Sequence, residues 1–543
     1  MKNITTLFVL LCLWTGCTKE FIPADIVSRP KTQFGTLPNP YTLANMQAVF
    51  DSLSLTKATL QPTDYYVRFL PQDSLQLFDL MYHYGLELFD YPLDIDLGEG
   101  EVYEDPTIPE DGFMWQYTTV KPDFIFPAGI YYEILEECYI PPANETIPLT
   151  RSGGLCYLED AAFERLGYKI EPPLQPQTRA GVKQSGQVSV LDNCLEKIQY
   201  VPIKGVKIRC NTIVKWATAY TDENGYYTMD GNFSIWPHYA IVFDNHKGFD
   251  IWDGWIHITK ATYHMGCHSR NGQSRSIFAG SAWRWAAVNN AAYEYYQMCE
   301  ATGITKPPAN LKIWVINSLG SSAAAMLSQI KDPIGLNGNS PWLNLLVNNT
   351  AGILANTLLP LLKNVILDIA IGTQNRSYRR IYGVTHHELA HASHFSEAGS
   401  AFWADYISYI ITYGAYGDGK GKNAEMCGVG EMWGFAMERI QECEKYEPGR
   451  LDSLYSANWD NNYWFKQEIF WDLYRKNILT KKQIFDCLSP DVDTYSKLID
   501  KMHTLYPTQS YAIDKAFIKY GLLPENDTRI PKRHHKKRTH HNL

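Results

Sequence analysis

Alternating apolar and polar residues distinguish the middle of the chain, residues 184–258, from the residues after it. A period of two predicts β-strands that bury one face. The clearest runs of this kind are residues 187–190, 206–210 and 239–243. Asn224-Gly225 lies between two of these runs, and this dipeptide accepts the positive φ angles of a tight hairpin turn. The pattern therefore predicts a strand-rich region with a hairpin at this dipeptide.

From about residue 259 the pattern changes to helices and strands that follow one another. Helices are predicted at residues 282–299, 321–330 and 342–362, and strands at residues 311–316 and 365–372. Four later helical runs, at residues 464–475, 481–487, 495–505 and 511–520, predict a helical cap. Polar and helix-breaking residues, among them Pro360 and Lys363, interrupt the apolar stretch 353–371. This stretch is therefore expected to be a core helix and strand rather than a membrane span.

The part of the chain before residue 184 mixes both kinds of pattern. Helices are predicted at residues 39–53 and 158–166, and a strand at residues 65–70. An acidic stretch at residues 99–111 lacks the spacing of a calcium-binding loop, which favours a solvated loop. Residues 36–183 are expected to form one mixed domain, to which the sequence assigns no role.

The first 17 residues have the features of a secretory signal. A basic start at Lys2 precedes an apolar run at residues 7–14, which is too short to span a membrane. Thr15-Gly16-Cys17 resembles the cleavage site of bacterial lipoproteins, which implies that Cys17 becomes the acylated first residue. The charged pair that follows, Lys19-Glu20, resembles a surface-export signal. We therefore expect a lipid anchor at Cys17 in the bacterial outer membrane, with the cell surface favoured over the periplasmic face.

Composition and charge narrow the classes of partner. The net charge is −9, although six Lys and Arg residues lie within residues 529–538, so the rest of the chain carries −15. This acidity argues against a nucleic-acid partner. Eleven cysteines without CxxC pairs argue against a cysteine-based zinc site. Cys194 with Cys210, or Cys427 with Cys443, remain candidate disulfide pairs.

The strongest chemical signal is one complete HExxH motif at residues 387–391. Residues four apart share one face of a helix, so His387 and His391 can bind a single metal ion. Zn²⁺ accepts imidazole nitrogens, and Glu388 can then take a proton from activated water. The flanking residues Leu389 and Ala390 suit a buried helix. The motif therefore predicts half of a hydrolytic zinc site.

A catalytic zinc site needs a third protein ligand and one open position. The candidates downstream are His394, Glu397, Asp405 and Glu431. His394 would lie about 10 Å beyond His387 along a continuous helix, too far to share the ion. Glu397 requires the helix to end before Gly399, and Asp405 lacks the Gly-Thr turn expected before an aspartate ligand.

Glu431 is the favoured third ligand. The glycine-rich residues 427–430 are expected to form a turn that leads into an apolar helix, with Glu431 in its first turn. Such a helix can pack closely beside the metal-binding helix. The alternative is that Glu431 merely complements the positive end of the helix dipole.

Three resemblances to known families add to these predictions. Residues 427–437, a glycine-rich turn that leads into an apolar helix with Glu431, resemble the gluzincin zinc metallopeptidases, in which a downstream helix supplies a glutamate ligand. The 40-residue separation of His391 and Glu431 exceeds the shortest gluzincin spacing. Residues 202–206 and 221–227 resemble the carboxypeptidase regulatory-like β-sandwich, usually an accessory spacer. The lipoprotein start, the β-sandwich and residues 385–395 and 428–433 together resemble large bacterial lipoproteins with a zinc-metallopeptidase domain, a resemblance that spans most of residues 36–525.

Together these patterns and resemblances imply a multidomain α+β protein. The expected order is a signal peptide (1–17), a tether (18–35), a mixed N-terminal domain (36–183), a β-sandwich (184–258), a zincin-like α/β domain with a helical cap (259–525) and a basic tail (526–543). The expected activity is zinc-dependent hydrolysis of a peptide or protein substrate.

Some roles remain open. Tyr413, Tyr416 and His394 are the candidate oxyanion donors, and the strand around residues 365–371 is expected to pair with an extended peptide. The alternative function is a non-catalytic surface lipoprotein that captures peptide or glycan for an outer-membrane importer. The intact Glu388 argues against that alternative, because binding alone has no use for a base.

Overall fold

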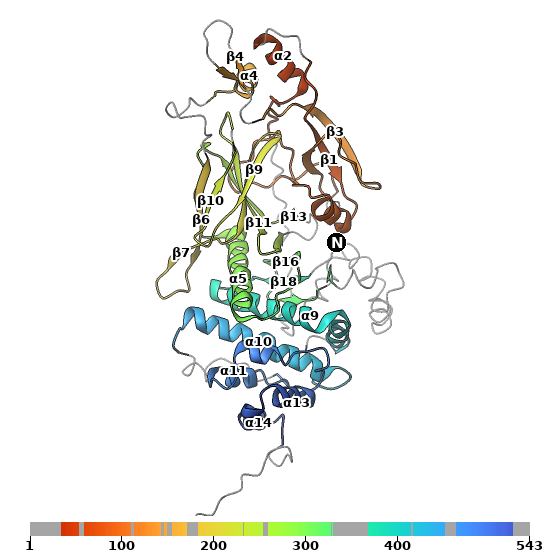
Figure 1. Ribbon diagram of the computed structural model, residues 1–543, viewed down its shortest axis with the longest axis vertical. Coiled ribbons are helices and arrows are strands. Elements are labelled where there is room, and N and C mark those ends of the chain that lie inside the picture. The colour runs from red at the N-terminus through yellow and green to blue at the C-terminus, as the bar shows by residue number, and fades with distance from the viewer. Residues whose placement is uncertain are drawn as a thin grey trace, which may run out of the picture.

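The computed structural model places the elements in an elongated stack (Figure 1). It describes residues 34–524 except 54–58, 110–112, 143–145, 149–154, 171–182, 232, 254–258, 327, 330–367, 414–415 and 451–462. The N-terminal elements lie at one end, two β-sheets lie in the middle, and a layer of helices closes the other end. Cys17, the helix expected at 342–362 and the basic tail lie outside the described residues.

The N-terminal region is built on a three-stranded antiparallel sheet. Its order is β2 (Gln116–Val120), β1 (Asp64–Leu70), β3 (Tyr131–Cys138). The smaller elements are α2 (Leu43–Leu53), α3 (Ser74–Phe78), the π-helical turn η1 (Asp79–His83), β4 (Thr146–Pro148), β5 (Leu155–Tyr157) and α4 (Leu158–Arg165). Helices α2 and α4 pack together through Met46, Val49, Leu158 and Ala162. The helices and the strand expected in this region are confirmed.

The middle of the molecule consists of two sheets that share one hydrophobic core. The smaller has the order β10 (Tyr226–Met229), β6 (Gln184–Asp192), β15 (Arg275–Ile277), with β7 (Gln199–Pro202) on β6. The larger runs β17 (Ala323–Ala324), β18 (Ile369–Gly372), β16 (Leu311–Ile316), β12 (Phe249–Asp253), β11 (His238–Asn245), β8 (Val206–Thr212), β9 (Lys215–Tyr220). Two short strands, β13 (Thr259–Lys260) and β14 (Thr262–Cys267), pair with β12 and β11.

The larger sheet is continuous across residue 258. Strand β12 pairs in parallel with β16, with Ile251 opposite Ile313, and β16 pairs in parallel with β18. All six side chains of β16 are buried, as is typical of a strand covered on both faces. Strands β8, β9, β11 and β12, which were expected to belong to a separate sandwich, are therefore part of the same sheet as the strands that lead to the HExxH helix, whereas β6, β7 and β10 belong to the smaller sheet.

The Asn224-Gly225 turn forms, but not as a hairpin. Gly225 has φ +74°, and its amide donates to the carbonyl of Asp222. The flanking strands belong to different sheets, because β9 pairs with β8 and β10 pairs with β6. The turn moves the chain from one sheet to the other, so the predicted hairpin was wrong while the tight turn was right.

Helices cover the large sheet and form the far end of the molecule (Figure 1). Helix α5 (Gly280–Thr302) lies on the sheet and also packs against α9 (Tyr378–Tyr413), which packs against α10 (Ala424–Tyr446). The remaining helices are α11 (Glu468–Arg475), α12 (Lys481–Phe485), α13 (Tyr495–Leu505), the 3-10 turn η2 (Pro507–Gln509) and α14 (Ser510–Lys519). These match the four runs expected to form the cap.

One helix expected from the sequence is replaced by a strand, and neither of the two possible disulfides forms. Residues 321–330 were expected to be helical, but Ala323–Ala324 form β17, which pairs antiparallel with β18. The eight cysteines whose side chains are described are all free thiols, so neither candidate disulfide forms. Cys427 and Cys443 lie on the same straight helix, about 24 Å apart along its axis, and a disulfide requires Cα atoms within about 7 Å. Cys210 is instead buried beside Met229.

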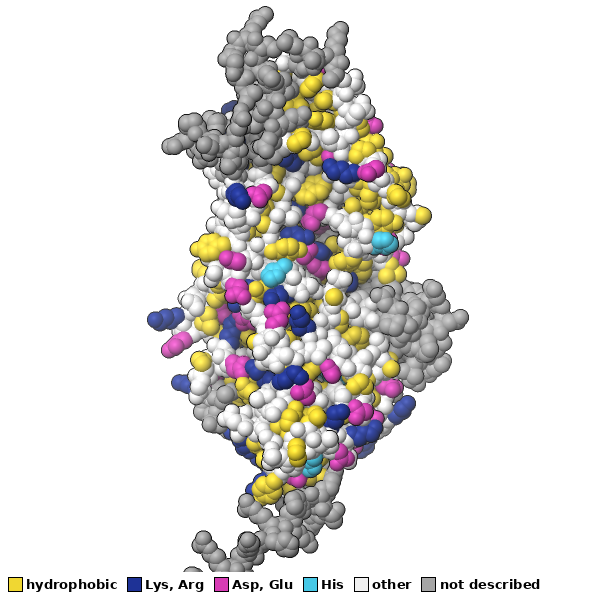
Figure 2. Space-filling model, in the orientation of Figure 1, with side chains coloured by type: hydrophobic (Ala, Val, Ile, Leu, Met, Phe, Trp, Pro, Cys, Tyr) yellow, Lys and Arg dark blue, Asp and Glu magenta, His cyan; other side chains and the backbone are white. Residues whose placement is uncertain are grey.

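On the face shown in Figure 2, acidic and basic side chains are interspersed along the middle of the molecule. Within the described ranges, no helix combines the length and the apolar character that crossing a bilayer requires.

Candidate metal centre

Helix α9 carries the HExxH motif and begins directly after the sheet. The side chain of Ser377 accepts a hydrogen bond from the amide of Arg380, which satisfies a donor at the start of the helix. Leu389, Ala390 and Ala392 are fully buried on the inner side of the helix. His387 and His391 then share a face one turn apart, and both are at least 94% buried.

The structure brings Glu431 of α10 to these two histidines. The Nε2 atoms of His387 and His391 are 3.1 Å apart. Glu431 Oε2 lies 3.5 Å from His387 Nε2, and Glu431 Oε1 lies 3.5 Å from His391 Nε2. All three residues are buried, and among the described residues they are the group whose donor atoms converge closely enough to hold a metal ion. The cluster can therefore hold a metal ion.

The position of Glu431 within its helix differs from the expectation. Helix α10 begins at Ala424, two turns before Glu431, so the glutamate is not in the first turn. The glycines before and after it lie inside the helix, where they allow close packing. A Cβ on Gly430 would stand 2.7 Å from the ring of Tyr406, and one on Gly434 would stand 2.9 Å from His387 Nε2. The helix-dipole alternative for Glu431 therefore does not apply.

A break in α9 brings a further side chain to the centre. Gly399 has φ +83° and ψ +170°, so the helix stops there and resumes in a new direction. Glycine adopts this conformation without steric cost. The second half returns Tyr406 to the metal helix, with its ring centroid 5.8 Å from that of His391. Its hydroxyl donates a hydrogen bond to Glu431 Oε1, which fixes the orientation of the carboxylate.

Glu438 contacts the ring nitrogen of His387 that faces away from the cluster, Nδ1. Its Oε2 lies 3.3 Å from Nδ1 of His387, on the opposite side of the ring from Nε2. Arg380 of α9 pairs with the same carboxylate. A carboxylate on the far nitrogen of a ligating histidine fixes the ring orientation and makes the other nitrogen a better ligand.

The buried cluster attracts positive charge. Burial lowers the pKa of His387, but contacts with Glu431 and Glu438 outweigh this effect and raise it to about 10. Burial likewise opposes ionisation of Glu431, yet the two histidines hold its pKa well below the usual range. Among the described residues, Oε2 of Glu431 has no hydrogen-bond partner although it is buried. Such an atom is costly unless a cation or donor satisfies it, so the residues present fit a bound metal ion.

Glu388 faces the same cavity as the three donors. The cavity has a volume of about 40 Å³, and its wall includes Glu388, Ala324, Ile407, Ile410 and Tyr416. Burial raises the pKa of Glu388 to about 8. A buried carboxyl group beside a metal-binding cluster can exchange protons near neutral pH.

The rival third ligands lie elsewhere. His394 is fully buried beside Phe402 and Trp403, and burial lowers its pKa to about 3. Glu397 is exposed and accepts a hydrogen bond from the hydroxyl of Thr305. Asp405 is only half-buried, and its side chain does not line the cavity. Of the candidates weighed from the sequence, Glu431 is the residue that reaches the histidines.

The structure also distinguishes among the three candidate oxyanion donors. Tyr416 lines the cavity, whereas Tyr413 is 45% exposed and His394 points into the aromatic core. The pKa of Tyr416 is raised well above its usual value, first by burial and then by the charge of Glu431. The hydroxyl therefore keeps its proton and can donate it in a hydrogen bond.

Sequence reasoning missed Tyr406, Glu438 and Gly434. Glu438 was within reach, because it follows Glu431 by seven residues, or two helical turns, and so shares its face. The other two depend on the angle between α9 and α10, which no local pattern encodes. In a comparison with protein-family models and with curated proteins, nothing matches this chain.

Proposed function

We propose that the protein is a zinc metallopeptidase, with His387, His391 and Glu431 as the zinc ligands and Glu388 as the general base. The observation that carries the proposal is the meeting of these four side chains at one cavity. Two ligands that bind a tetrahedral Zn²⁺ at about 2.0–2.1 Å stand about 3.3 Å apart. The two Nε2 atoms are 3.1 Å apart, and each lies 3.5 Å from a different oxygen of the Glu431 carboxylate, distances close to that spacing, which supports the proposal.

The proposed chemistry is hydrolysis of a peptide bond. A bound zinc ion would supply a Lewis acid and would lower the pKa of water towards about 7. Glu388 accepts a proton from the attacking water and passes it to the leaving nitrogen as the C–N bond breaks. The Tyr416 hydroxyl is assigned the role of donor to the developing oxyanion, because its ring lines the same cavity and its proton is retained.

An extended substrate is proposed to pair with β17. The sequence pointed to the strand around residues 365–371, but β18 is internal, with β16 on one side and β17 on the other. Strand β17 is the outermost of this sheet in the described part of the chain. Ala323 and Ala324 line the cavity itself. Backbone pairing there would hold a peptide in register without demanding a particular sequence.

The proposed location is the outer membrane of a bacterium, with the protein anchored through acylated Cys17 and facing the cell surface. The support is the sequence of residues 1–20, which lie outside the described residues. Labelling with a radioactive fatty acid tests the anchor. Wild type should incorporate label and Cys17→Ser should not.

The activity is tested with the full-length protein, a mixed peptide library and measured zinc content. We expect Glu388→Gln to retain zinc and to lower kcat by roughly 100- to 10,000-fold, the usual share of general acid–base catalysis. The matched control is Glu397→Gln on the exposed side of the same helix, which should cleave normally. Unchanged cleavage by Glu388→Gln would overturn the assignment of the base. Zinc and peptide binding without cleavage by wild type would favour the capture protein instead.

A further inference from the structure

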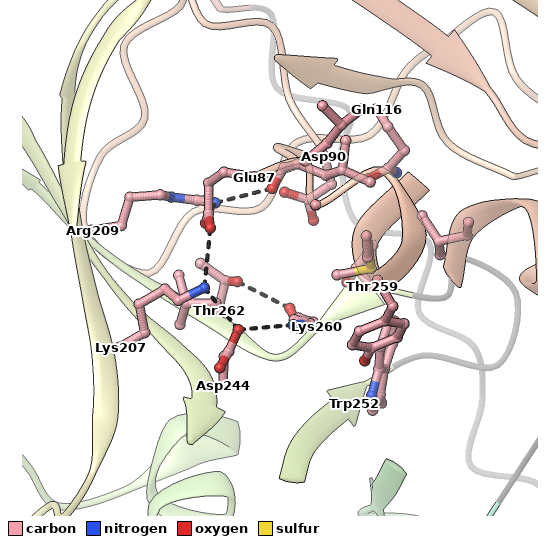
Figure 3. A pocket seen from close by; sticks show the side chains of 17 residues that line it. Glu87, Asp90, Gln116, Lys207, Arg209, Asp244, Trp252, Thr259, Lys260 and Thr262 are labelled. Atoms are coloured by element: carbon pink, nitrogen blue, oxygen red, sulfur yellow. Dashed lines mark hydrogen bonds and ion pairs between the residues drawn. The ribbon is translucent and has the colours of Figure 1, made fainter. Parts of the chain in front are cut away.

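A second and larger cavity lies between the N-terminal region and the large sheet, away from the metal centre (Figure 3). Its volume is about 220 Å³, and it shares no lining residue with the metal-centre cavity. Glu87, Asp90 and Gln116 enter it from the N-terminal side. Lys207 and Arg209 of β8 and Asp244 of β11 enter it from the sheet.

One wall of the cavity is a chain of alternating charges. The contacts run from Arg209 to Glu87 (3.1 Å), from Glu87 to Lys207 (3.0 Å), from Lys207 to Asp244 (2.8 Å), from Asp244 to Lys260 (2.9 Å) and from Lys260 to Asp250 (3.1 Å). We call these six residues the charge chain; all of them except Asp250 line the cavity. It holds three cations and three anions, and each charge is compensated by a neighbour. A ligand with a net charge would meet both signs at similar distances and gain little from either.

The charge chain still has hydrogen-bonding capacity to offer. An ammonium group has three donors and a carboxylate about four acceptor sites, so lysines with two partners and an Asp244 with three are not saturated. Ammonium donors and carboxylate acceptors alternate along the wall, and the contacting nitrogen and oxygen atoms are about 3 Å apart. Further polar groups come from Gln116, Thr259 and Thr262, and Thr259 hydrogen-bonds to Asp90. Adjacent hydroxyl groups, each both donor and acceptor, match such a wall.

Another part of the lining is apolar, and we call it the apolar wall. Its half-buried members, Met81, Leu86 and Leu88, can contact a ligand, whereas Leu77 and Trp252 are buried in the packing around the cavity. Trp252 is fully buried, and its ring stacks on that of Trp314 at a centroid distance of 5.5 Å. A ligand that fits both walls has hydroxyl groups around its edge and a C–H face. A sugar ring has this division of polar and apolar surface.

We propose that the cavity between β8, β11 and the N-terminal region is a binding site for an uncharged saccharide, with room for about one ring. The hydroxyl groups of the sugar contact the charge chain, and its C–H face packs against the apolar wall. This site is independent of the proposed peptidase chemistry. It would give the protein a means of recognising sugar-bearing material apart from the metal centre.

The test is calorimetric titration of the full-length protein with D-glucose, D-galactose, D-mannose and N-acetyl-D-glucosamine in turn. At least one should bind with a dissociation constant of about 1 mM, the strength usual for a ligand of some 12 non-hydrogen atoms. Asp90→Asn, which keeps the shape of the side chain, and Thr262→Leu, which fills the cavity and removes a hydroxyl, should each weaken binding at least tenfold.

The controls separate the cavity from the rest of the protein. Thr218→Leu makes the same substitution at an exposed position of β9 in the same sheet and should leave binding unchanged. Glu388→Gln should also bind the sugar normally. The melting temperature of every variant confirms that it is folded. The proposal is overturned if no sugar binds, if binding survives both cavity variants, or if glycylglycine or inorganic phosphate binds there in place of the sugars.

Discussion

The two cavities of this protein handle buried charge in opposite ways. At the metal centre, three donors point at one another, and a buried oxygen of Glu431 has no hydrogen bond among the described residues. In the charge chain, every cation touches an anion of the same wall. The first arrangement is incomplete without an external cation, whereas the second is complete by itself.

This difference explains what each cavity can recognise. A cluster of buried acceptor atoms that lack a compensating cation is stabilised most by a small, strongly charged ligand. A wall of balanced charges gains nothing from net charge but retains directional hydrogen bonds. Substitutions at the two sites should therefore affect different properties: metal affinity at the first and the stability of the fold at the second.

The largest expected effect comes from the metal centre itself. Glu431→Gln replaces an anionic ligand by a neutral amide, and we expect zinc affinity to fall on the order of 1,000-fold, beyond the 10- to 100-fold typical of outer contacts. Because a metal that binds only the native state stabilises it, a chelator should lower the melting temperature of wild type. The same chelator should leave the variant unchanged. An equal response of both proteins would show that Glu431 does not bind the ion.

Lys207→Met tests whether the charge chain stabilises the fold. This side chain is 13% exposed and pairs with both Glu87 and Asp244, so its removal leaves each of these largely buried carboxylates with a single cation, Arg209 or Lys260. We expect the free energy of unfolding to fall by about 2 kcal/mol, less than for a buried charge left with no partner, with zinc content unchanged. The control is Lys497→Met, which breaks an exposed pair with Asp493 and should cost less than about 1 kcal/mol. Denaturant unfolding measures both, and equal losses would contradict the compensated wall.

The sequence predicted the part of the metal centre that depends on residues close together in the chain. The spacing of His387 and His391 fixes a shared helical face, and the glycines around Glu431 marked a close helix contact. Those glycines were assigned to a turn, because sequence alone does not distinguish a glycine needed for φ from one needed for space. Gly434 belongs to the second kind, since a Cβ there would press on both ligand imidazoles.

The fold was predictable element by element but not in its pairing. The periodicity located β8, β11 and β16, yet the parallel pairing of β12 with β16 joins residues about 60 positions apart. Alternation of apolar and polar residues shows which face of a strand is buried, but it does not show which strand pairs with it. For the same reason the outermost strand next to the metal centre, β17, was taken for part of a helix. Two alanines carry no pattern of their own.

Tyr406→Phe should have a moderate effect confined to the metal centre. The hydroxyl that orients Glu431 is lost while the ring stays in place, and loss of such a contact typically costs 10- to 100-fold in metal affinity. The control is Tyr413→Phe, two turns later and exposed, which should bind zinc as wild type does. Zinc competition with a chromogenic chelator measures both variants. Identical affinities would mean that the carboxylate is held by its helix alone.

The smallest effect concerns acid stability at the charge chain. Burial raises the pKa of Glu87, but Lys207 and Arg209 outweigh it and hold that pKa below its usual value. A carboxyl group with a lowered pKa in the folded state stabilises the protein above its unfolded pKa of about 4.3, and the contribution is lost as pH falls through the folded value. Between pH 5 and pH 3 the melting temperature of wild type should therefore fall more steeply than that of Glu87→Gln, which has no proton to gain at this position. Parallel curves would mean that Glu87 gains no stabilisation from its two cations, and the wall would then be less balanced than its distances indicate.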